Sequence, residues 1–262
     1  MENVVYFSDI NKLKSNNLDC DRIYFGNEFC DERIPSLDDL RVAISIAKER
    51  NKGFGFVTCY VSEYKIEKYY CLLNALAELL PGSEVIINDW GILKICLQNN
   101  LTPVLGRLLV RQKRDPRISS FMKLLPDLSK LRLHQTGLSN YFKDFLKTQC
   151  INRIELDNLI QGIDINELQD VNFNYSIYIP YGYVTTTRIC FFRNKNLSKD
   201  KRFSILPCTN KSNCGLAKLH NRQIKDILFM RGNTIFFKNT SQVFLKSDSR
   251  IDRIVHELEI PD

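Results

Sequence analysis

Cysteine is the residue type in this chain that is best suited to metal chemistry. Three cysteines lie in the C-terminal third, Cys190, Cys208 and Cys214, and Cys30 follows an early predicted strand. Thiolates are soft ligands that suit zinc and iron–sulfur clusters, so four of them can hold one metal centre. Spacing alone does not select these four, because nine cysteines produce some close pairs by chance. Whether these four cysteines form one site must be judged from the sequence around them and from the elements that carry them.

Zinc and a metal-free core are the alternatives for these thiols. Structural zinc sites usually present close pairs of cysteines, whereas the closest pair among these four, Cys208 and Cys214, has five residues between its members. Free cysteine is also a common buried residue. The remaining five cysteines lie on apolar faces of predicted elements or near their ends, and we interpret them as packing residues: Cys20, Cys59, Cys71, Cys96 and Cys150.

Composition predicts one large globular domain in a reducing compartment. The chain has 262 residues, of which 44% are hydrophobic and 26% charged, so it can bury a sizeable core. No apolar run approaches the roughly 18 residues of a membrane span, and the N-terminus lacks a basic start followed by an apolar stretch. We therefore expect a cytoplasmic protein without a membrane span. An odd number of cysteines there indicates thiols and metal ligands rather than a disulfide frame.

Positive charge is concentrated in one stretch. Five cations fall within eleven residues of a chain whose net charge is +7: Arg107, Arg111, Lys113, Arg114 and Arg117. Clustered cations attract phosphates, nucleic acids or acidic protein surfaces. The run is thus a candidate for contact with an anion or an anionic substrate, and its alternative is a solvated surface loop.

Strand and helix patterns alternate along most of the chain. Short apolar runs predict strands at residues 21–26, 53–61, 84–88, 102–106, 153–156 and 173–180. Amphipathic patterns predict helices at 36–50, 66–80, 90–98 and 139–150. This alternation is typical of a parallel sheet, and six or seven βα units favour a barrel over an open doubly wound sheet. No glycine-rich dinucleotide loop or phosphate loop opens any of the helices.

The last third of the chain has a different character. We expect one domain over residues 1–262, with βα repeats to 190 and then a cysteine-bearing stretch to 262. Residues 226–237 and 242–246 look β-like. Apolar residues at Ile251, Ile254, Val255 and Leu258 predict a terminal helix.

Three segments resemble the collagenase-like peptidase family U32, in particular the branch of the anaerobic ubiquinone-biosynthesis protein UbiV. Residues 24–33 read YFGNEFCDER, in which Cys30 follows the glycine by four positions. Residues 88–93, NDWGIL, are similar to the family's helix start, and residues 188–191, RICF, are similar to its Ala-Arg-Cys-Phe segment. Together with Cys208 and Cys214, the resemblance covers most of the chain.

The resemblance implies a fold, a cofactor and a role. The fold is a distorted or incomplete TIM-like barrel, here with a cysteine-bearing C-terminal extension. The cofactor is a [4Fe–4S] cluster at the barrel mouth, with ligands that fall on Cys30, Cys190, Cys208 and Cys214. The role is to assist oxygen-independent hydroxylation or a related modification, beside a second family member in a heterodimer. The gaps before Cys208 and Cys214 are longer than the branch leads one to expect.

Two other functions stay open. A peptidase-like hydrolase is disfavoured because Tyr181-Gly182 stands where peptidase-like members carry His-Gly, and because His134, His220 and His256 have no evident nucleophile partner. Acid–base work by Glu28, Glu155 and Asp157 is conceivable, although no spacing selects them. A component of tRNA or rRNA hydroxylation is the third reading, since other branches modify RNA and the cation run offers phosphate contacts.

Overall fold

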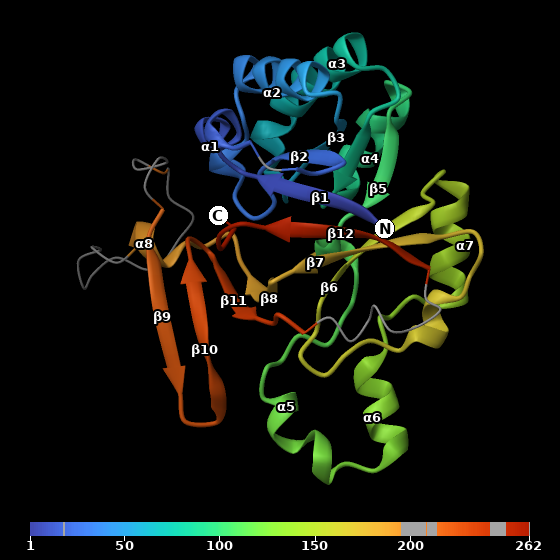
Figure 1. Cartoon of the computed structure of the whole chain (residues 1–262), viewed down its shortest axis with the longest axis vertical. Helices are drawn as coiled ribbons and strands as arrows, with labels where there is room; N and C mark the ends of the chain where they lie inside the picture. The colour runs from blue at the N-terminus through green and yellow to red at the C-terminus, as the bar shows by residue number, and fades with distance from the viewer. Residues whose placement is uncertain (18, 195–207, 209–213, 242–249, 262) are drawn as a thin grey trace.

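Parallel strands close into a barrel at the centre of the computed structural model. The structure describes residues 1–17, 19–194, 208, 214–241 and 250–261. In this part of the chain eight barrel strands follow in order: β1 (Glu2–Phe7), β2 (Arg22–Gly26), β3 (Gly53–Val57), β4 (Glu84–Ile87), β5 (Thr102–Leu105), β6 (Arg153–Asp157), β7 (Asn174–Ile179) and β12 (Ile251–Glu257). The last strand pairs with both β1 and β7, which closes the barrel (Figure 1). The expectation of an α/β TIM-like barrel is confirmed.

Helices cover one half of the barrel regularly. The helices are α1 (Ile10–Ser15), α2 (Leu37–Glu49), α3 (Ile66–Leu79), α4 (Trp90–Gln98), α5 (Ile118–Phe121), α6 (Asp127–His134), α7 (Asn140–Thr148) and α8 (Phe191–Asn194). The side chain of Ser36 caps α2 in a reciprocal capping box with Asp39, and Asp89 caps α4. Among the described residues, no helix is long and apolar enough to cross a membrane.

The other half of the barrel departs from the βα rhythm. Only a short 3₁₀ turn, Ile165–Leu168, lies between β6 and β7. Between β5 and β6 the chain forms a lobe with α5 and α6 before α7 returns to the barrel (Figure 1). The barrel is therefore closed in its strands but incomplete in its outer helices.

A small antiparallel sheet replaces the helix between β7 and β12. Its strands are β8 (Tyr181–Thr186), β9 (Leu216–Asn221), β10 (Ile224–Arg231) and β11 (Thr234–Lys238), in the spatial order β8-β11-β10-β9. Phe236 and Tyr183 of this sheet pack with Phe29, which follows β2, in one apolar cluster. The small sheet is thereby fastened to the carboxyl end of the barrel, where (β/α) barrels place their sites.

The end of the chain corrects one prediction. The terminal helix expected from Ile251, Ile254, Val255 and Leu258 is wrong, because residues 251–257 form the barrel strand β12. Strand alternation holds there, but Arg253 and Glu257 take buried positions that the apolar pattern leaves unmarked. The first strand, β1, was not predicted either. The β-like segment 226–237 lies in β10 and β11, and the segment 242–246 lies outside the described residues.

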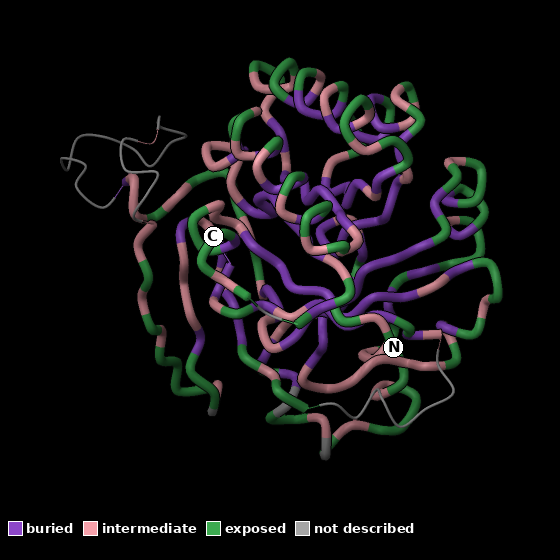
Figure 2. The backbone as a smooth tube through the Cα atoms, turned by 45° about the horizontal axis from the view of Figure 1, so that its top comes forward, coloured by how far each residue is buried: buried purple, intermediate pink, exposed green. Residues whose placement is uncertain are grey.

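Side chains with mixed polarity fill the barrel interior. Alternate strand residues form one buried apolar cluster separate from the larger one around the strands and helices: Val4, Tyr6, Tyr24, Val57, Ile86, Val104, Tyr178 and Val255. Glu155 and Arg253 are buried as well, and Arg253 binds both Glu84 and the Tyr24 hydroxyl. The backbone at the centre of Figure 2 is accordingly coloured mostly as buried. The interior is thus a packed, partly charged core rather than a channel.

We predict that Gly26 is intolerant of any side chain. Its φ is +145°, and an added methyl group would lie 2.0 Å from the carbonyl oxygen of Val57. Gly26→Ala should lower the free energy of unfolding by roughly 2–5 kcal/mol, since it combines backbone strain with overpacking. Gly82→Ala is the matched control, because Gly82 also has a positive φ of +73° but open space around it. Chemical denaturation of both variants measures the difference, and equal losses would contradict the packing argument.

Candidate functional site

A buried arginine lies at the centre of the barrel's carboxyl end. Arg107 follows β5 and is fully buried. Its guanidinium donates to Glu28 Oε2 at 2.8 Å, Asp157 Oδ1 at 3.0 Å and Glu257 Oε1 at 2.5 Å, and to the backbone oxygen of Tyr181 at 2.9 Å. The same guanidinium lies 3.9 Å from the ring centre of Tyr178. This one side chain therefore joins the ends of β2, β5, β6 and β12.

A tight turn aims Arg107 into the barrel. An added methyl group at Gly106 would lie 2.2 Å from Asn88 Oδ1, so only glycine allows this approach. Asn88 then accepts a hydrogen bond from the backbone N–H of Leu108 and donates to the backbone oxygen of Thr58. The Asn88 amide thereby fixes the turn on which Arg107 stands.

The charges around Arg107 do not balance when all are ionised. Arg114 also donates to Asp157, at 2.6 Å, so two guanidiniums face the carboxylates of Glu28, Asp157 and Glu257. Burial raises the pKa of Glu257 to about 8, although Arg107 favours its charged form. A proton on Glu257 at neutral pH removes the excess negative charge. Although burial opposes charge on Arg107, the three carboxylates hold its pKa well above the usual value.

A second carboxyl lies deeper in the barrel. Glu155 is fully buried and accepts hydrogen bonds from the hydroxyls of Tyr24 at 2.8 Å and Tyr178 at 2.5 Å. Burial raises the pKa of Glu155 to about 7, against the effect of these two hydrogen bonds. Glu155 is thus held by tyrosines, whereas Glu28 and Asp157 are held by Arg107.

The cation run divides into structural and exposed members. Arg107 points inward, and Arg114 uses its guanidinium on Asp157 and on the backbone oxygens of Val110, Gln112 and Arg107. Arg111, Lys113 and Arg117 are exposed, and Arg117 pairs with Asp115. Three side chains of the run, Arg111, Lys113 and Arg117, are therefore available to contact an anion from solvent. Arg107 is buried among carboxylates, and Arg114 is paired with Asp157.

Cys30 and Cys190 line one small cavity beside the small sheet. The cavity has a volume of about 20 Å³, and Arg193 and Asn233 also border it. Asn27 Oδ1 accepts a hydrogen bond from the backbone N–H of Cys30 at 2.8 Å and fixes this turn. Burial raises the pKa of the Cys30 thiol, and charge at Cys190 acts in the same direction.

Cys208 lies beside a residue that borders the same cavity, and Cys214 lies one residue further from it. The Arg193 side chain hydrogen-bonds Cys208 and forms an ion pair of 3.0 Å with Glu32. The sulfur of Cys214 lies against Gly232, where an added methyl group would come within 2.8 Å of it. The next residue, Asn233, donates to the backbone oxygen of Phe29 at 2.7 Å. All four thiols named by the resemblance thus gather at one corner of the molecule, which we call the cysteine corner.

In type and number these thiols fit an iron–sulfur centre, which is commonly held by four thiolates. The described residues contain no group of three or more Cys, His, Asp or Glu side chains placed to hold a metal ion. Binding a cluster therefore requires the segments that carry the four thiols to draw closer together. Cys59 is a further thiol near Cys30, but it is fully buried and lies 3.3 Å from the Tyr69 hydroxyl.

The residues considered for hydrolysis are occupied by the protein itself. Glu28, Asp157 and Glu155 are fully buried in the contacts described above. His134 ends α6, His220 lies in β9, and the ring of His256 in β12 lies 3.2 Å from Asn3 Oδ1. The carboxylates and histidines considered for hydrolysis therefore supply no accessible acid–base pair.

Sequence reasoning missed three residues of these sites, Arg193, Asn233 and Glu257, because a single charged or amide residue forms no recognisable pattern.

The fold places the chain in the class of TIM-like α/β barrels. No protein-family model and no curated protein matches the chain. It is similar to a solved structure of a U32 peptidase, Mk0906, with a TM-score of 0.50 and 11% sequence identity. The match covers 100% of this chain and 94% of that chain. A likeness at this identity shows a shared fold and nothing finer.

We predict that loss of the Arg107 side chain strongly destabilises the fold. Arg107→Met leaves three buried carboxylates without their shared cation, and it should lower the free energy of unfolding by about 3–5 kcal/mol. Arg117→Met, from the same cation run, is the control and should leave the denaturation midpoint almost unchanged, because the Arg117–Asp115 pair is exposed. Urea denaturation followed by circular dichroism measures both. Similar midpoints for the two variants would contradict the central role of Arg107.

We predict a pH dependence that comes from Glu155. With a folded pKa of about 7 against an ordinary value of 4.5, Glu155 keeps a proton that the unfolded chain releases. Its contribution to stability is full below pH 4.5 and is lost as the pH rises through about 7. Glu155→Gln should therefore flatten the fall of unfolding free energy between pH 5 and pH 7 by about 1.4 kcal/mol per pH unit. Denaturation at several pH values measures this, and an unchanged slope would count against a protonated Glu155.

Proposed function

We propose that the chain is an iron–sulfur protein of the U32 family, in the branch of UbiV, with Cys30, Cys190, Cys208 and Cys214 as ligands of a [4Fe–4S] cluster. The observation that carries the proposal is the cysteine corner. Two of these thiols border one cavity, Cys208 contacts Arg193, which also borders it, and Cys214 lies against Gly232, the residue before Asn233 of the lining. The four cysteines are spread over residues 30 to 214, and simple packing gives no reason for them to lie around the same cavity.

The surroundings of the cysteine corner suit a negatively charged group. Arg193 has a side chain only 9% exposed and lies between Glu32 and Cys208, and Arg188 borders the cavity. Arg193, which is largely shielded from solvent, and the exposed Arg188 both offset the negative charge that four thiolates bring together. When bound, the cluster supplies electron transfer. The residues of this chain hold the turn of Cys30 through Asn27 and link it through Asn233 to the segment before Cys190.

The wider role that we propose is to assist an oxygen-independent hydroxylation or a related modification, beside a second U32 protein. This role rests on the resemblance of residues 24–33, 88–93 and 188–191 to the UbiV branch. It accords with carboxylates that are locked around Arg107 and its neighbours rather than presented to a peptide. Hydrolysis of peptides by the same fold is the competing outcome that the experiment below separates.

We predict that anaerobically purified protein contains about four irons and four sulfides per chain. Iron, sulfide and zinc counts, with optical and EPR spectra, should show the cluster in the wild type and its loss in Cys30→Ala, Cys190→Ala, Cys208→Ala and Cys214→Ala. The matched controls are Cys96→Ala, Cys59→Ala and Cys71→Ala, which remove two buried thiols and one exposed thiol outside the ligand set. These three should keep their iron.

The opposite results are equally specific. Stoichiometric zinc, or no metal in any preparation, would remove the iron–sulfur proposal. Loss of iron in Cys59→Ala with retention in Cys208→Ala or Cys214→Ala would replace one ligand by Cys59. A metal-free preparation that cleaves peptides would favour the hydrolase.

A further inference from the structure

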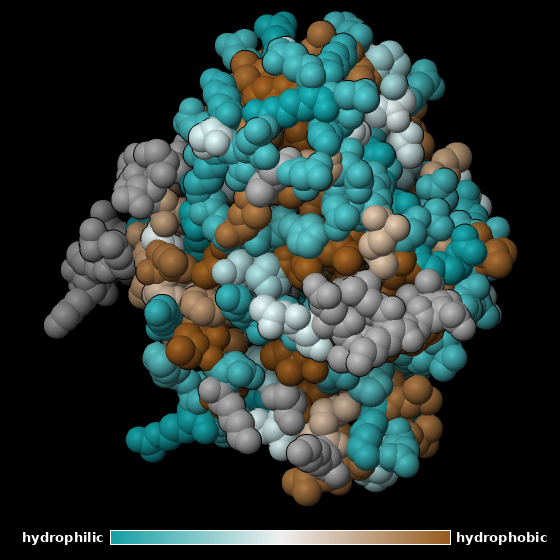
Figure 3. All heavy atoms as spheres, in the orientation of Figure 1, coloured by the Kyte–Doolittle hydropathy of each residue, from teal (hydrophilic) through white to brown (hydrophobic). Residues whose placement is uncertain are grey.

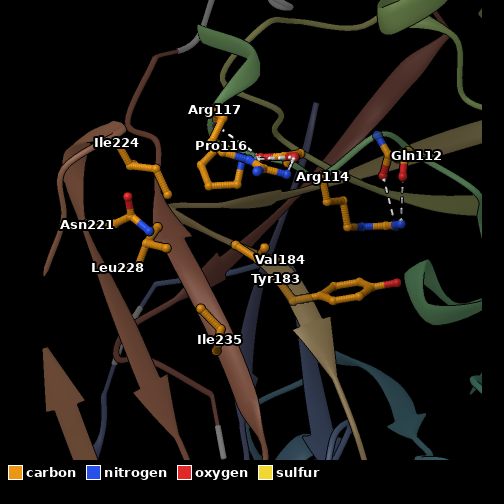
Figure 4. A pocket seen from close by; sticks show the side chains of 11 residues that line it. Gln112, Arg114, Pro116, Arg117, Tyr183, Val184, Asn221, Ile224, Leu228 and Ile235 are labelled. Carbon is orange, nitrogen blue, oxygen red and sulfur yellow. Dashed lines mark hydrogen bonds and ion pairs between the residues drawn. The ribbon is translucent and has the colours of Figure 1, made fainter. Parts of the chain in front are cut away.

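A larger cavity lies on the other side of β8 from the cysteine corner. Its volume is about 410 Å³, within the range of small-molecule sites. It opens between the loop of residues 112–117 and the small sheet, and we call it the sheet groove (Figure 4). In Figure 3, apolar patches interrupt the hydrophilic surface in the lower half of the molecule, where the small sheet faces the α5–α6 lobe. None of the four cysteines lines this groove, whereas Arg114 and Arg117 of the cation run do.

One wall of the sheet groove is apolar. Val184 of β8, Ile235 of β11 and Ile224 of β10 line it and remain only partly buried, although they pack beside Leu228. Figure 4 shows these side chains on the sheet, with Pro116 and Arg117 on the facing loop. A hydrogen bond from Ser120 Oγ to the backbone oxygen of Gln223 joins the loop side to the sheet side. Aliphatic side chains that stay partly open to a cavity favour an apolar ligand body.

The other wall and the rim carry positive charge. Arg117 lines the groove, and its pair with Asp115 is exposed, so a ligand can exchange for it at little cost. Arg111, Lys113 and Arg222 are exposed on the two segments that border the groove. Asp115 is the acidic side chain among the lining residues, and Asn221 adds an amide. The balance favours an anionic group near Arg117.

The sheet groove and the cysteine corner share aromatic residues. Tyr183 lines the groove, and its ring centre lies 5.7 Å from that of Phe29, the residue before Cys30. Arg114 lies over the Tyr183 ring at 4.1 Å and fixes it from the barrel side. The packed rings of Tyr183 and Phe29 therefore connect the groove to the turn of Cys30.

We propose that the sheet groove binds the substrate of the proposed function, and that this substrate is a small molecule with an apolar body and an anionic group. That the ligand is a substrate rests on the proposed function. That the groove binds a ligand of this class does not. The apolar body lies on Val184, Ile224 and Ile235, and the anionic group pairs with Arg117 in place of Asp115.

Anilinonaphthalene sulfonate is a suitable probe because it combines an aromatic body with one anionic group and fluoresces when bound. The experiment titrates the anaerobically purified full chain, whose iron has been counted, with this probe. The uncharged analogue N-phenyl-naphthylamine measures the contribution of the anion. Binding of one probe per chain is expected, at least about fivefold tighter than binding of the uncharged analogue.

Two variants and their matched controls test the location. Val184→Trp fills the groove and should abolish saturable binding, whereas Tyr141→Trp places the same ring at an exposed position on α7, outside the groove lining, and should not. Arg117→Gln should weaken binding about fivefold, whereas Arg41→Gln, which breaks the exposed Arg41–Asp38 pair on α2, should leave it unchanged. Circular dichroism and denaturation midpoints establish that each variant is folded.

Each contrary result would overturn one stated part of the proposals. Binding that Val184→Trp does not reduce removes the groove as the site. If Val184→Trp reduces binding but Arg117→Gln does not, the ligand need not carry an anionic group and that part of the proposal is wrong. Equal binding of the uncharged analogue would lead to the same conclusion. Four irons per chain without probe binding overturns the groove and leaves the cluster standing. Probe binding that follows this pattern without iron overturns the cluster and leaves the groove.

Discussion

The ion pairs of Arg107 with three carboxylates are the constraint on which the carboxyl end of the barrel depends. All the N–H groups of this guanidinium donate to Glu28, Asp157, Glu257 or the backbone oxygen of Tyr181. A buried charge without partners costs several kcal/mol, so none of these four groups can move independently of the others. Strand ends that are far apart in the sequence are thereby fixed in one position. We call these strand ends, joined by Arg107, the platform. The cysteine corner and the sheet groove both lie next to it.

The platform reaches the cysteine corner through short links. Glu28 and Cys30 share one turn, and Asn27 fixes the backbone of that turn. Asn233 donates to the backbone oxygens of Phe29 and Thr187, which ties the turn to the small sheet and to the segment before Cys190. The sheet groove is linked in the same way, because Arg114 binds Asp157 and also covers Tyr183. One charge network therefore positions two neighbouring sites.

Apolar patterns predicted most of the fold but not the charged interior. The strand runs near Phe25, Ile86 and Val104 and the amphipathic helices α2, α3 and α4 were correctly located, because their buried faces are apolar. The last strand was taken for a helix, since Arg253 and Glu257 occupy its buried positions and the remaining apolar residues follow a helical spacing. Arg107 was placed in an exposed run for the same reason. Sequence patterns treat a charged residue as a surface residue, whereas these side chains find partners from distant strands.

The two halves of the proposed ligand set differ in the parts of the fold that they contact. Cys30 stands on the turn that Glu28 and Asn27 fix to the barrel, and Cys190 follows β8 by a few residues. Cys208 instead hydrogen-bonds the Arg193 side chain of α8, and Cys214 lies against Gly232 in the turn between β10 and β11, so neither of these contacts is with a barrel strand. Metal–thiolate bonds are strong compared with such contacts. A cluster at this corner would therefore join Cys208 and Cys214 to thiols that the barrel face already positions, rather than assemble the barrel itself.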